Sequence, residues 1–327
     1  MSNEKKAYQQ VFKATSLFGG VQVFTILIKI IRSKFIAILL GPEGMGIAGL
    51  LNSTIKLIEG FTNFGLGTSA VKNVAEANTT NNKNRIGLIV RVVRRLVWLT
   101  GILGALITLI FSSTLSQITF GNEQYTIAFI WLSITLLINQ LTEGEYVVLR
   151  GSRKLNYLAK ASLTGSLLGL IFSLPIYYIW GIDGIVPAII ITSVINFLRT
   201  WYFSSKVHVE KVQLDYKTTI KEGNEMLLMG IMLSLSGIIK LGASYALRIF
   251  ISHKGGVEHV GLYTAGFAIV ETYVGMIFTA MATDYYPRLS VVNQDIKKVK
   301  QAVTQQASIA ILLLAPIIVA FIAFIPI

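Results

Sequence analysis

Residues 28–51 read IKIIRSKFIAILLGPEGMGIAGLL and contain two apolar stretches separated by a short turn. The turn, residues 41–44 (GPEG), is rich in glycine and proline, which is typical of a chain reversal. A transmembrane helix needs about 20 predominantly apolar residues. The apolar stretches on either side of the turn reach that length, over 15–40 and 46–71, so this segment predicts a pair of membrane-spanning helices.

The same pattern recurs along the whole chain of 327 residues. Hydrophobic residues make up 53% of the sequence and charged residues only 14%, whereas a soluble domain carries about 25% charge. Apolar runs such as Ile185 to Ile191 favour helices, because strands of an outer-membrane barrel would alternate apolar and polar residues. We therefore expect an all-α polytopic membrane protein with nine transmembrane helices, at 15–40, 46–71, 88–111, 125–148, 158–180, 184–204, 227–251, 261–283 and 306–327.

The basic residues lie almost entirely on one side of the predicted helices. The formal net charge is +13, from 29 Lys and Arg against 16 Asp and Glu. With the N-terminus inside, 22 of the 29 lie on the cytoplasmic side, in the connections or at the adjoining ends of the spans, and only Lys254 falls in an outer connection. This split follows the positive-inside rule and predicts a multi-pass protein of the cell inner membrane with a cytoplasmic N-terminus. It also accounts for the basic charge without a nucleic-acid partner. The outer connections are 41–45, 112–124, 181–183 and 252–260.

The remaining six cations fall inside predicted spans, where a charge costs about 2.5–3.5 kcal/mol on insertion scales. Lys29 and Arg32 share one face of the first span, and Lys56 and Glu59 share one face of the second, because three residues make nearly one helical turn. Such polar faces on apolar helices should turn toward a bundle interior or a wet cavity. The six cations are Lys29, Arg32, Lys34, Lys56, Lys240 and Arg248.

Carboxylates deep in the spans are too few to neutralise these cations. Only Glu59 and Glu271 lie there, so about four cations lack a protein partner, and an anionic ligand would supply the compensation. In the alternative interpretation, Lys34 and Arg248 extend to the outer interface and the other cations pair within the bundle. The candidate substrate-binding residues are Lys29, Arg32, Lys56, Lys240 and Arg248.

The two deep carboxylates are also candidates for ion coupling. Glu59 shares a helix face with Lys56, so we expect these two side chains to pair. Glu271 has no cation at helical spacing in its own span, and a carboxyl buried without a partner can load and release a proton. We therefore favour Glu271 over Glu59 as the coupling residue. The alternative is that Glu271 pairs with Lys240 or Arg248 and serves only assembly.

Signals for chemistry are otherwise weak. The chain has no cysteine and no phosphate-binding loop, so we expect a transporter rather than an enzyme, with no cofactor and no metal. The group His253, Glu258 and His259 is better interpreted as a solvated loop than as a metal site. Glu143 and Glu145 fit either a proton relay or a salt-bridge cluster with the nearby Arg150 and Arg153.

An internal repeat links the two parts of the chain. Residues 238–267 read IIKLGASYALRIFISHKGGVEHVGLYTAGF and resemble the opening stretch. Lys29 corresponds to Lys240 at an offset of 211 residues, and Gly46 corresponds to Gly261 at an offset of 215. Repeated bundles with a site between them are a recurring transporter design. Two six-helix repeats would need at least twelve helices, so we expect a partial chain. It would consist of an N-terminal six-helix bundle (1–210) and the first three helices of a second bundle (211–327).

Three short segments resemble one transporter family. Residues 39–50, LLGPEGMGIAGL, following a basic first helix, resemble the start of Wzx-type O-antigen and enterobacterial-common-antigen flippases. Residues 150–154 (RGSRK) and 180–188 (WGIDGIVPA) are similar to that family as well. These flippases belong to the multidrug/oligosaccharidyl-lipid/polysaccharide exporter superfamily. The resemblance implies twelve or more helices in two bundles and a central cavity with cationic residues.

The resemblance further implies a substrate. It would be an undecaprenyl-pyrophosphate-linked oligosaccharide, moved from the cytoplasmic to the periplasmic leaflet by alternating access. Candidate partners are this lipid, a proton or sodium counter-ion, the surrounding membrane lipid and the polysaccharide polymerase machinery. Two alternatives stay open. A lipid II-type precursor flippase would have the same charge requirements, and a cation-coupled multidrug exporter would need a net acidic site.

Overall fold

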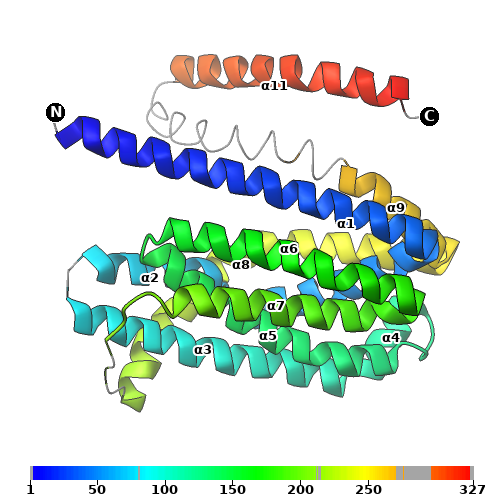
Figure 1. The fold of residues 1–327 in the computed structure, drawn as a ribbon, viewed down its shortest axis with the longest axis horizontal. Helices are drawn as coiled ribbons and strands as arrows, with labels where there is room; N and C mark the ends of the chain where they lie inside the picture. The colour runs from blue at the N-terminus through cyan, green and yellow to red at the C-terminus, as the bar shows by residue number, and fades with distance from the viewer. Residues whose placement is uncertain are drawn as a thin grey trace. The chain divides into compact units, whose positions relative to one another are not determined.

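The structure is a computed structural model of the chain, and it describes residues 3–79, 82–210, 212, 215–269, 275 and 296–324. Every regular element in these residues is helical (Figure 1), which confirms the predicted all-α class. The elements are α1 (Asn3–Thr62), α2 (Leu66–Thr79), α3 (Lys83–Ile110), α4 (Ser112–Phe120), α5 (Thr126–Gly151), α6 (Leu155–Trp180), the 3₁₀ helix η1 (Gly181–Gly184), α7 (Ile185–Ser204), α8 (Tyr216–Gly255), α9 (Val257–Ile269) and α11 (Ile296–Phe324).

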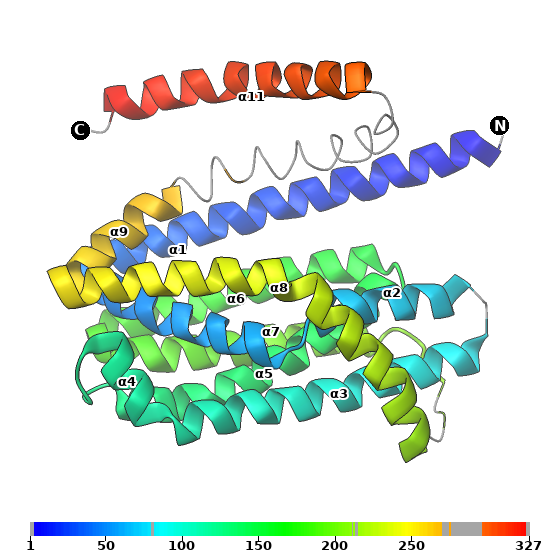
Figure 2. The same ribbon diagram turned by 180° about the vertical axis from the view of Figure 1, so that it is seen from behind.

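The turn predicted at residues 41–44 is a sharp kink within α1. Gly41 has φ 64° and ψ −171°, a conformation that glycine adopts without steric penalty. Pro42 follows it and cannot donate a backbone hydrogen bond, so the helical ladder is interrupted here. The two legs, residues 3–40 and 42–62, fold back on one another (Figure 2). They contain the first predicted span and most of the second.

The second predicted span, 46–71, is wrong in one respect, because it is not a single helix. α1 ends at Thr62, and Phe64 and Gly65 have φ values of 48° and 65°. The Asn63 side chain accepts a hydrogen bond from the Gly65 backbone N–H at 2.7 Å. This local bond competes with the helical ladder and ends the helix.

The other predicted spans coincide with helices as far as the description extends. Spans three to seven lie in α3, α5, α6, α7 and α8. The eighth, 261–283, begins in α9 and continues beyond the described residues, and the ninth, 306–327, lies in α11 up to residue 324.

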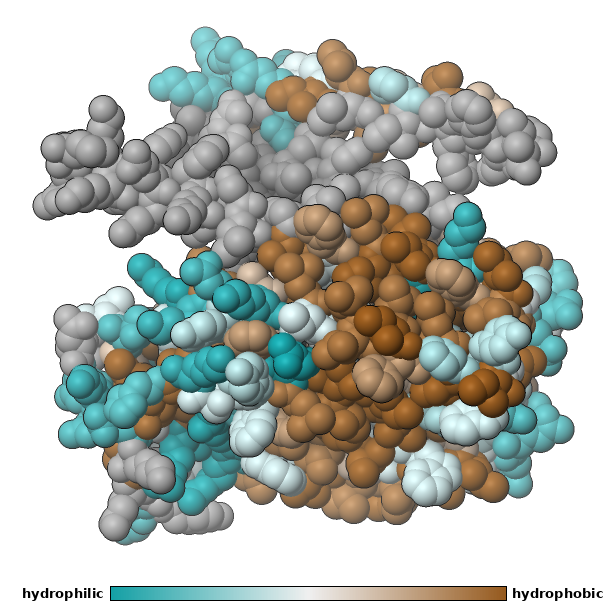
Figure 3. Space-filling view, in the orientation of Figure 1, coloured by the Kyte–Doolittle hydropathy of each residue, from teal (hydrophilic) through white to brown (hydrophobic). Residues whose placement is uncertain are grey.

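Length and composition make part of the described helices candidates for membrane spans. Five segments are long and apolar enough to cross a membrane, two of which hold more than one predicted span. Large apolar side chains such as Trp131 and Ile171 are exposed on them, and an apolar band covers the middle of the first unit (Figure 3). The chain is therefore a multi-pass membrane protein. The five segments are Leu27–Thr62, Lys83–Ile110, Thr126–Gly151, Leu155–Ser204 and Lys217–Gly255.

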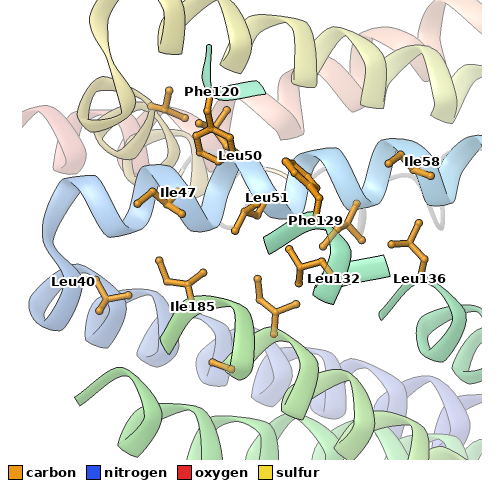
Figure 4. Packing of buried hydrophobic residues seen from close by; sticks show 14 of the residues in the cluster. Leu40, Ile47, Leu50, Leu51, Ile58, Phe120, Phe129, Leu132, Leu136 and Ile185 are labelled. Carbon is orange, nitrogen blue, oxygen red and sulfur yellow. The ribbon is translucent and has the colours of Figure 1, made fainter. Parts of the chain in front are cut away.

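The buried core lies where the second leg of α1 meets its neighbours. Leu50 and Leu51 of α1 pack with Phe129 and Leu132 of α5 and with Ile185 at the start of α7 (Figure 4). All five are at most 1% exposed. Burial of this kind stabilises each side chain by roughly 1.5–3 kcal/mol in water. A second cluster joins α2, α3, α5 and α8.

The chain divides into two compact units, residues 1–262 and 263–327. In the first unit, α8 packs against α1, α2, α3 and α4. The second unit contains the end of α9 and α11, a helix with Pro316 inside it. The division at residues 210 and 211, which we derived from the repeat, stays a prediction.

The helices of the first unit run between two chemically different ends. The basic end contains α2, the start of α3, the α5–α6 turn and the α7–α8 connection, where hydrophilic residues gather (Figure 3). The far end contains the Gly41 kink, α4, η1 and the α8–α9 turn. Both names are used in this sense below.

Candidate functional site

The predicted site residues lie on α1 and α8. α8 runs beside the second leg of α1 (Figure 2). Glu271 lies outside the described residues, so its coupling role stays a prediction. The described site residues are Lys29 and Arg32 on the first leg of α1, Lys56 and Glu59 on its second leg, and Lys240 and Arg248 on α8.

Arg32 is half-buried and is held by neutral groups. Its Nη2 atom lies 3.4 Å from both the Tyr177 hydroxyl of α6 and the Thr192 hydroxyl of α7. Tyr177 is itself buried. Among the described residues, Arg32 has no carboxylate within 4.0 Å. The guanidinium is therefore oriented by hydroxyls of α6 and α7, and no carboxylate of the described residues neutralises it.

The lysines on α1 are more open than Arg32. Lys29, Lys34 and Lys56 are exposed, and none of them forms a hydrogen bond or ion pair with the part of the chain that the structure describes. Lys29 precedes Arg32 by three residues, so both lie on one helix face. These ammonium groups are placed where a ligand can reach them.

The cations on α8 differ from each other in burial. Lys240 is exposed and Arg248 is half-buried. Arg248 Nη1 donates to the carbonyl oxygen of Ser244, at 3.1 Å, and to its hydroxyl. This internal bond directs the guanidinium back along α8.

Glu59 does not form the predicted pair with Lys56. Its Oε1 atom instead accepts a hydrogen bond of 2.7 Å from Asn139 Nδ2 on α5. Glu59 and Lys56, both described, are not within ion-pair distance of each other. The reason is tertiary: α5 packs against α1 and offers an amide donor to a carboxylate that Lys56 leaves unpaired. Sequence reasoning missed Asn139 as a partner, although it shares a helical stripe with Glu143.

The carboxylates at the basic end of α5 form ion pairs. Glu143 Oε1 lies 2.8 Å from Arg150 Nη1 on the same helix. Glu145, which is 7% exposed, accepts from Arg94 Nε at 3.0 Å and Nη2 at 2.8 Å. The Ser204 hydroxyl also donates to Glu145, at 2.5 Å, so this carboxylate joins α3, α5 and α7. Of the two interpretations, these contacts favour the ion pairs, although Glu145 pairs with Arg94 and, among the described residues, Arg153 forms no ion pair.

Arginines of α3 hold the start of α8 at the basic end. Arg85 donates to both oxygens of Glu222, at 2.6 and 2.9 Å, in a bidentate pair. Arg95 donates to the Thr219 hydroxyl at 2.7 Å, and Arg91 donates to the carbonyl oxygen of Val212. Three arginines of one helix thus anchor the α7–α8 connection.

The far end of α8 is held by hydroxyl groups. The Thr119 hydroxyl of α4 lies 2.7 Å from the Tyr245 hydroxyl of α8 and 3.4 Å from the Thr54 hydroxyl of α1. All three residues are buried. Buried polar groups need such partners, so this chain of hydroxyls joins three helices at low net cost.

Near these hydroxyls, at the far end, the backbones of α1 and the start of α9 approach each other closely. A Cβ added to Gly46 would collide with the carbonyl oxygen of Val257, and one added to Gly261 would collide with that of Pro42. Gly46 and Gly261 are 215 residues apart, and so are Pro42 and Val257. A contact in which each partner repeats the other's role is the signature of a two-fold relation. The glycines matched in the repeat therefore lie against each other, around a local pseudo-two-fold axis.

Comparisons with known proteins agree with this architecture. A family model described as "Polysaccharide biosynthesis protein" matches residues 35–326. A solved structure described as the inward-facing conformation of a multidrug resistance MATE family transporter of the MOP superfamily is similar, with a TM-score of 0.72 and 17% sequence identity. The match covers 92% of this chain and 70% of that chain, and it shows the fold. No curated protein matches.

Proposed function

The chain belongs to the polysaccharide biosynthesis protein family, and from that premise we propose that it is a flippase for a lipid-linked saccharide. The substrate would be an undecaprenyl-pyrophosphate-linked oligosaccharide, such as an O-antigen or a related surface-polysaccharide repeat. The protein would move this lipid from the cytoplasmic to the periplasmic leaflet by alternating access through a cationic cavity between two bundles. As a transporter of the MOP fold, it would carry its substrate across chemically unchanged.

The observation that carries this proposal is the state of Arg32. A guanidinium within a membrane span is oriented by two hydroxyls, and no described carboxylate neutralises it. Lys29 lies one turn away on the same face, and Lys56 adds an exposed ammonium on the second leg. Such an arrangement retains positive charge at membrane depth, which favours an anionic ligand.

A pyrophosphate headgroup has the chemistry to fill this role. Arginine binds phosphate through two parallel hydrogen bonds, and lysine binds it as a compact point charge. Lys240 and Arg248 of α8 would contact the headgroup from the second repeat. The polyprenyl tail would stay in lipid while the headgroup crosses. The reciprocal contact of Gly46 with Gly261 supports a repeated design, in which two halves rock about a shared axis.

Energy coupling would use a carboxylate. Glu59 lies within a span and is held only by Asn139 in the described part of the chain, so its charge is not paired with a cation. Glu271, which the sequence favours over Glu59, lies outside the described residues and stays a candidate. Either carboxylate could bind and release the coupled counter-ion, a proton or sodium, during transport.

The positive-inside pattern supports an orientation with the basic end in the cytoplasm of a bacterial-type inner membrane. Cysteine labelling with an impermeant reagent in intact cells tests it. Lys254→Cys at the far end should be labelled, and Asn84→Cys at the basic end should be labelled only after permeabilisation. The opposite pattern would reverse the orientation.

The function is tested in a flippase-null strain that accumulates lipid-linked repeats. The protein should restore surface polysaccharide, Lys29→Gln should abolish the rescue while the protein stays in the membrane, and Lys29→Arg should retain part of it. Lys34→Gln is the matched control, because Lys34 is exposed and lies off the polar face. Rescue by Lys29→Gln would contradict the proposal.

A multidrug exporter is the second candidate, favoured by the fold match to a MATE family transporter. Organic cations would need a net acidic site, whereas the described spans hold more cations than carboxylates. Drug resistance conferred on a sensitive strain, without polysaccharide rescue, would select the exporter. Rescue of a strain lacking its cell-wall precursor flippase would select a lipid II-type substrate.

A further inference from the structure

A group of cations at the basic end of α6 and α7 has no role in the transport proposal. Arg199 lies on α7 and Lys206 follows the end of that helix. Both cations contact the same two rings: Arg199 Cζ lies 5.4 Å from the Tyr202 centroid and 5.2 Å from that of Phe203. Lys206 Nζ lies 4.2 and 5.6 Å from the same centroids. Two like charges are thus held within a few ångströms of one aromatic pair.

The rings and the guanidinium are fixed by their neighbours. Arg199 Nε donates to the Thr164 hydroxyl of α6 at 3.0 Å. Phe203 is buried and stacks on Tyr157 of α6, with centroids 6.2 Å apart, while Tyr202 meets it edge-on at 5.2 Å. The Arg199 guanidinium therefore has a preset direction, and its two terminal nitrogens carry N–H groups that can donate to a bidentate acceptor.

In the part of the chain that the structure describes, no carboxylate balances this pair of cations. Between residues 150 and 209 the sequence has a single acidic residue, Asp183, which lies in η1 at the far end. Neither Arg199 nor Lys206 has a carboxylate within 4.0 Å among the described residues. The nearest carboxylate along the chain on that side, Glu210, lies 3.6 Å from His208 Nε2 instead. Repulsion between the two cations would be relieved by an anion placed between them.

The surroundings identify the kind of anion. Leu198 and Trp201 are half-exposed on the same stretch of α7, and Leu167 and Ile171 continue the apolar surface on α6. Tryptophan, tyrosine and basic residues gathered at the end of apolar helices mark the level of the lipid headgroups. At this depth the abundant anion is the phosphate of a membrane lipid, and basic sites between helix ends bind such headgroups.

We propose that Arg199 and Lys206, stacked on Tyr202 and Phe203, bind the headgroup phosphate of an anionic phospholipid of the surrounding membrane. The Arg199 guanidinium contacts the phosphate oxygens, and the Lys206 ammonium neutralises the remaining charge. The acyl chains lie along the apolar surface of α6 and α7. This site is independent of the transported lipid and anchors the α6–α7 pair in the leaflet at the basic end.

Native mass spectrometry of the purified chain in detergent tests the site. Dioleoyl-phosphatidylglycerol and dioleoyl-phosphatidylcholine are added in turn, and retention of each is compared. The chain should retain phosphatidylglycerol roughly thirtyfold better, since two cations near the headgroups together contribute about 2 kcal/mol, and every 1.4 kcal/mol is a factor of ten. The double variant Arg199→Gln/Lys206→Gln should lose this preference. The single variant Lys206→Gln, which alters only an exposed side chain, should lose part of it.

A double variant with the same loss of charge elsewhere at the basic end is the control. Lys83→Gln/Lys221→Gln removes two exposed lysines away from the aromatic pair, and it should keep the full preference. Equal retention of both lipids by the unaltered chain would overturn the site, and so would an unchanged preference in the Arg199→Gln/Lys206→Gln variant. Displacement of phosphatidylglycerol by undecaprenyl pyrophosphate, only where Arg199 and Lys206 are present, would assign the site to the substrate and overturn the phospholipid assignment.

Discussion

The two ends of α8 are fastened to the N-terminal helices by different chemistry. At the basic end, Arg85 and Glu222 form a bidentate ion pair whose arginine side chain is 42% exposed. At the far end, the hydroxyls of Thr119 and Tyr245 meet in a buried contact, beside the close approach of Gly46 and Gly261. The contact at the basic end is therefore charged and partly exposed to solvent, whereas the contact at the far end is neutral and buried.

This difference has a consequence for the alternating access that we propose. Exposed ion pairs contribute little net free energy and weaken with salt. Close packing and buried hydrogen bonds contribute more, and salt does not screen them. We therefore expect the basic end to open at lower energetic cost than the far end.

The largest effect is expected from the glycine contact. Gly46→Val places a side chain against the Val257 carbonyl and forces α1 and α9 apart, which should lower the free energy of unfolding by about 2–3 kcal/mol. The apparent melting temperature of the detergent-solubilised protein measures the loss. Gly237→Val on the exposed surface of α8, where no described atom lies within 4 Å, should shift it little. Equal shifts of the melting temperature in both variants would show that the glycine contact at the far end does not stabilise the protein more than an exposed position does.

An intermediate effect is expected from the buried hydroxyl chain. Tyr245→Phe leaves the ring in place and removes the partner of Thr119, so it should destabilise the fold by about 1 kcal/mol. Thermal unfolding at low and high salt should give the same loss. Tyr178→Phe, at a side chain that is 78% exposed, serves as the control. A loss that disappears at high salt would argue against a buried, neutral fastening.

The smallest effect is expected from the ion pair at the basic end. A double-mutant cycle of Arg85→Gln and Glu222→Gln should give a coupling energy below about 1 kcal/mol at low salt. The coupling should decrease further at about 1 M salt, where the screening length is roughly 3 Å. A coupling of several kcal/mol, unaffected by salt, would show that the basic end is the stronger fastening.

Local pattern was enough to predict the helices and several contacts. The apolar stretches gave the helical class, and the turn at residues 41–44 is the kink at Gly41. The repeat matched Gly46 with Gly261 on a weak sequence similarity, and these two residues touch. Helices, turns and repeats depend on residues close in sequence or on a pattern that recurs along the chain, so a single sequence is enough to predict them.

The partners of the polar residues could not be predicted in this way. Lys56 was expected to pair with Glu59 because helical spacing allows it, but Asn139, 80 residues away, binds Glu59 instead. Arg32 is oriented by hydroxyls from Tyr177 and Thr192, 145 and 160 residues away. Tyrosine and threonine are common on apolar helices, so their presence in the sequence does not predict a contact with Arg32. The packing of α6 and α7 on α1 brings the Tyr177 and Thr192 hydroxyls within reach of it.

The most direct test of the central claim is the movement of an undecaprenyl-pyrophosphate-linked oligosaccharide across reconstituted vesicles. Arg32→Gln keeps a hydrogen-bonding group toward Tyr177 and Thr192 while removing the charge, so it should slow translocation at least about tenfold, since hydrogen bonds to charged groups contribute roughly 1.5–3 kcal/mol. Arg32→Lys should retain part of the rate, and Lys34→Gln should behave like the unaltered protein. If Arg32→Gln translocates the lipid at the unaltered rate in correctly folded protein, the cation on α1 does not bind the headgroup.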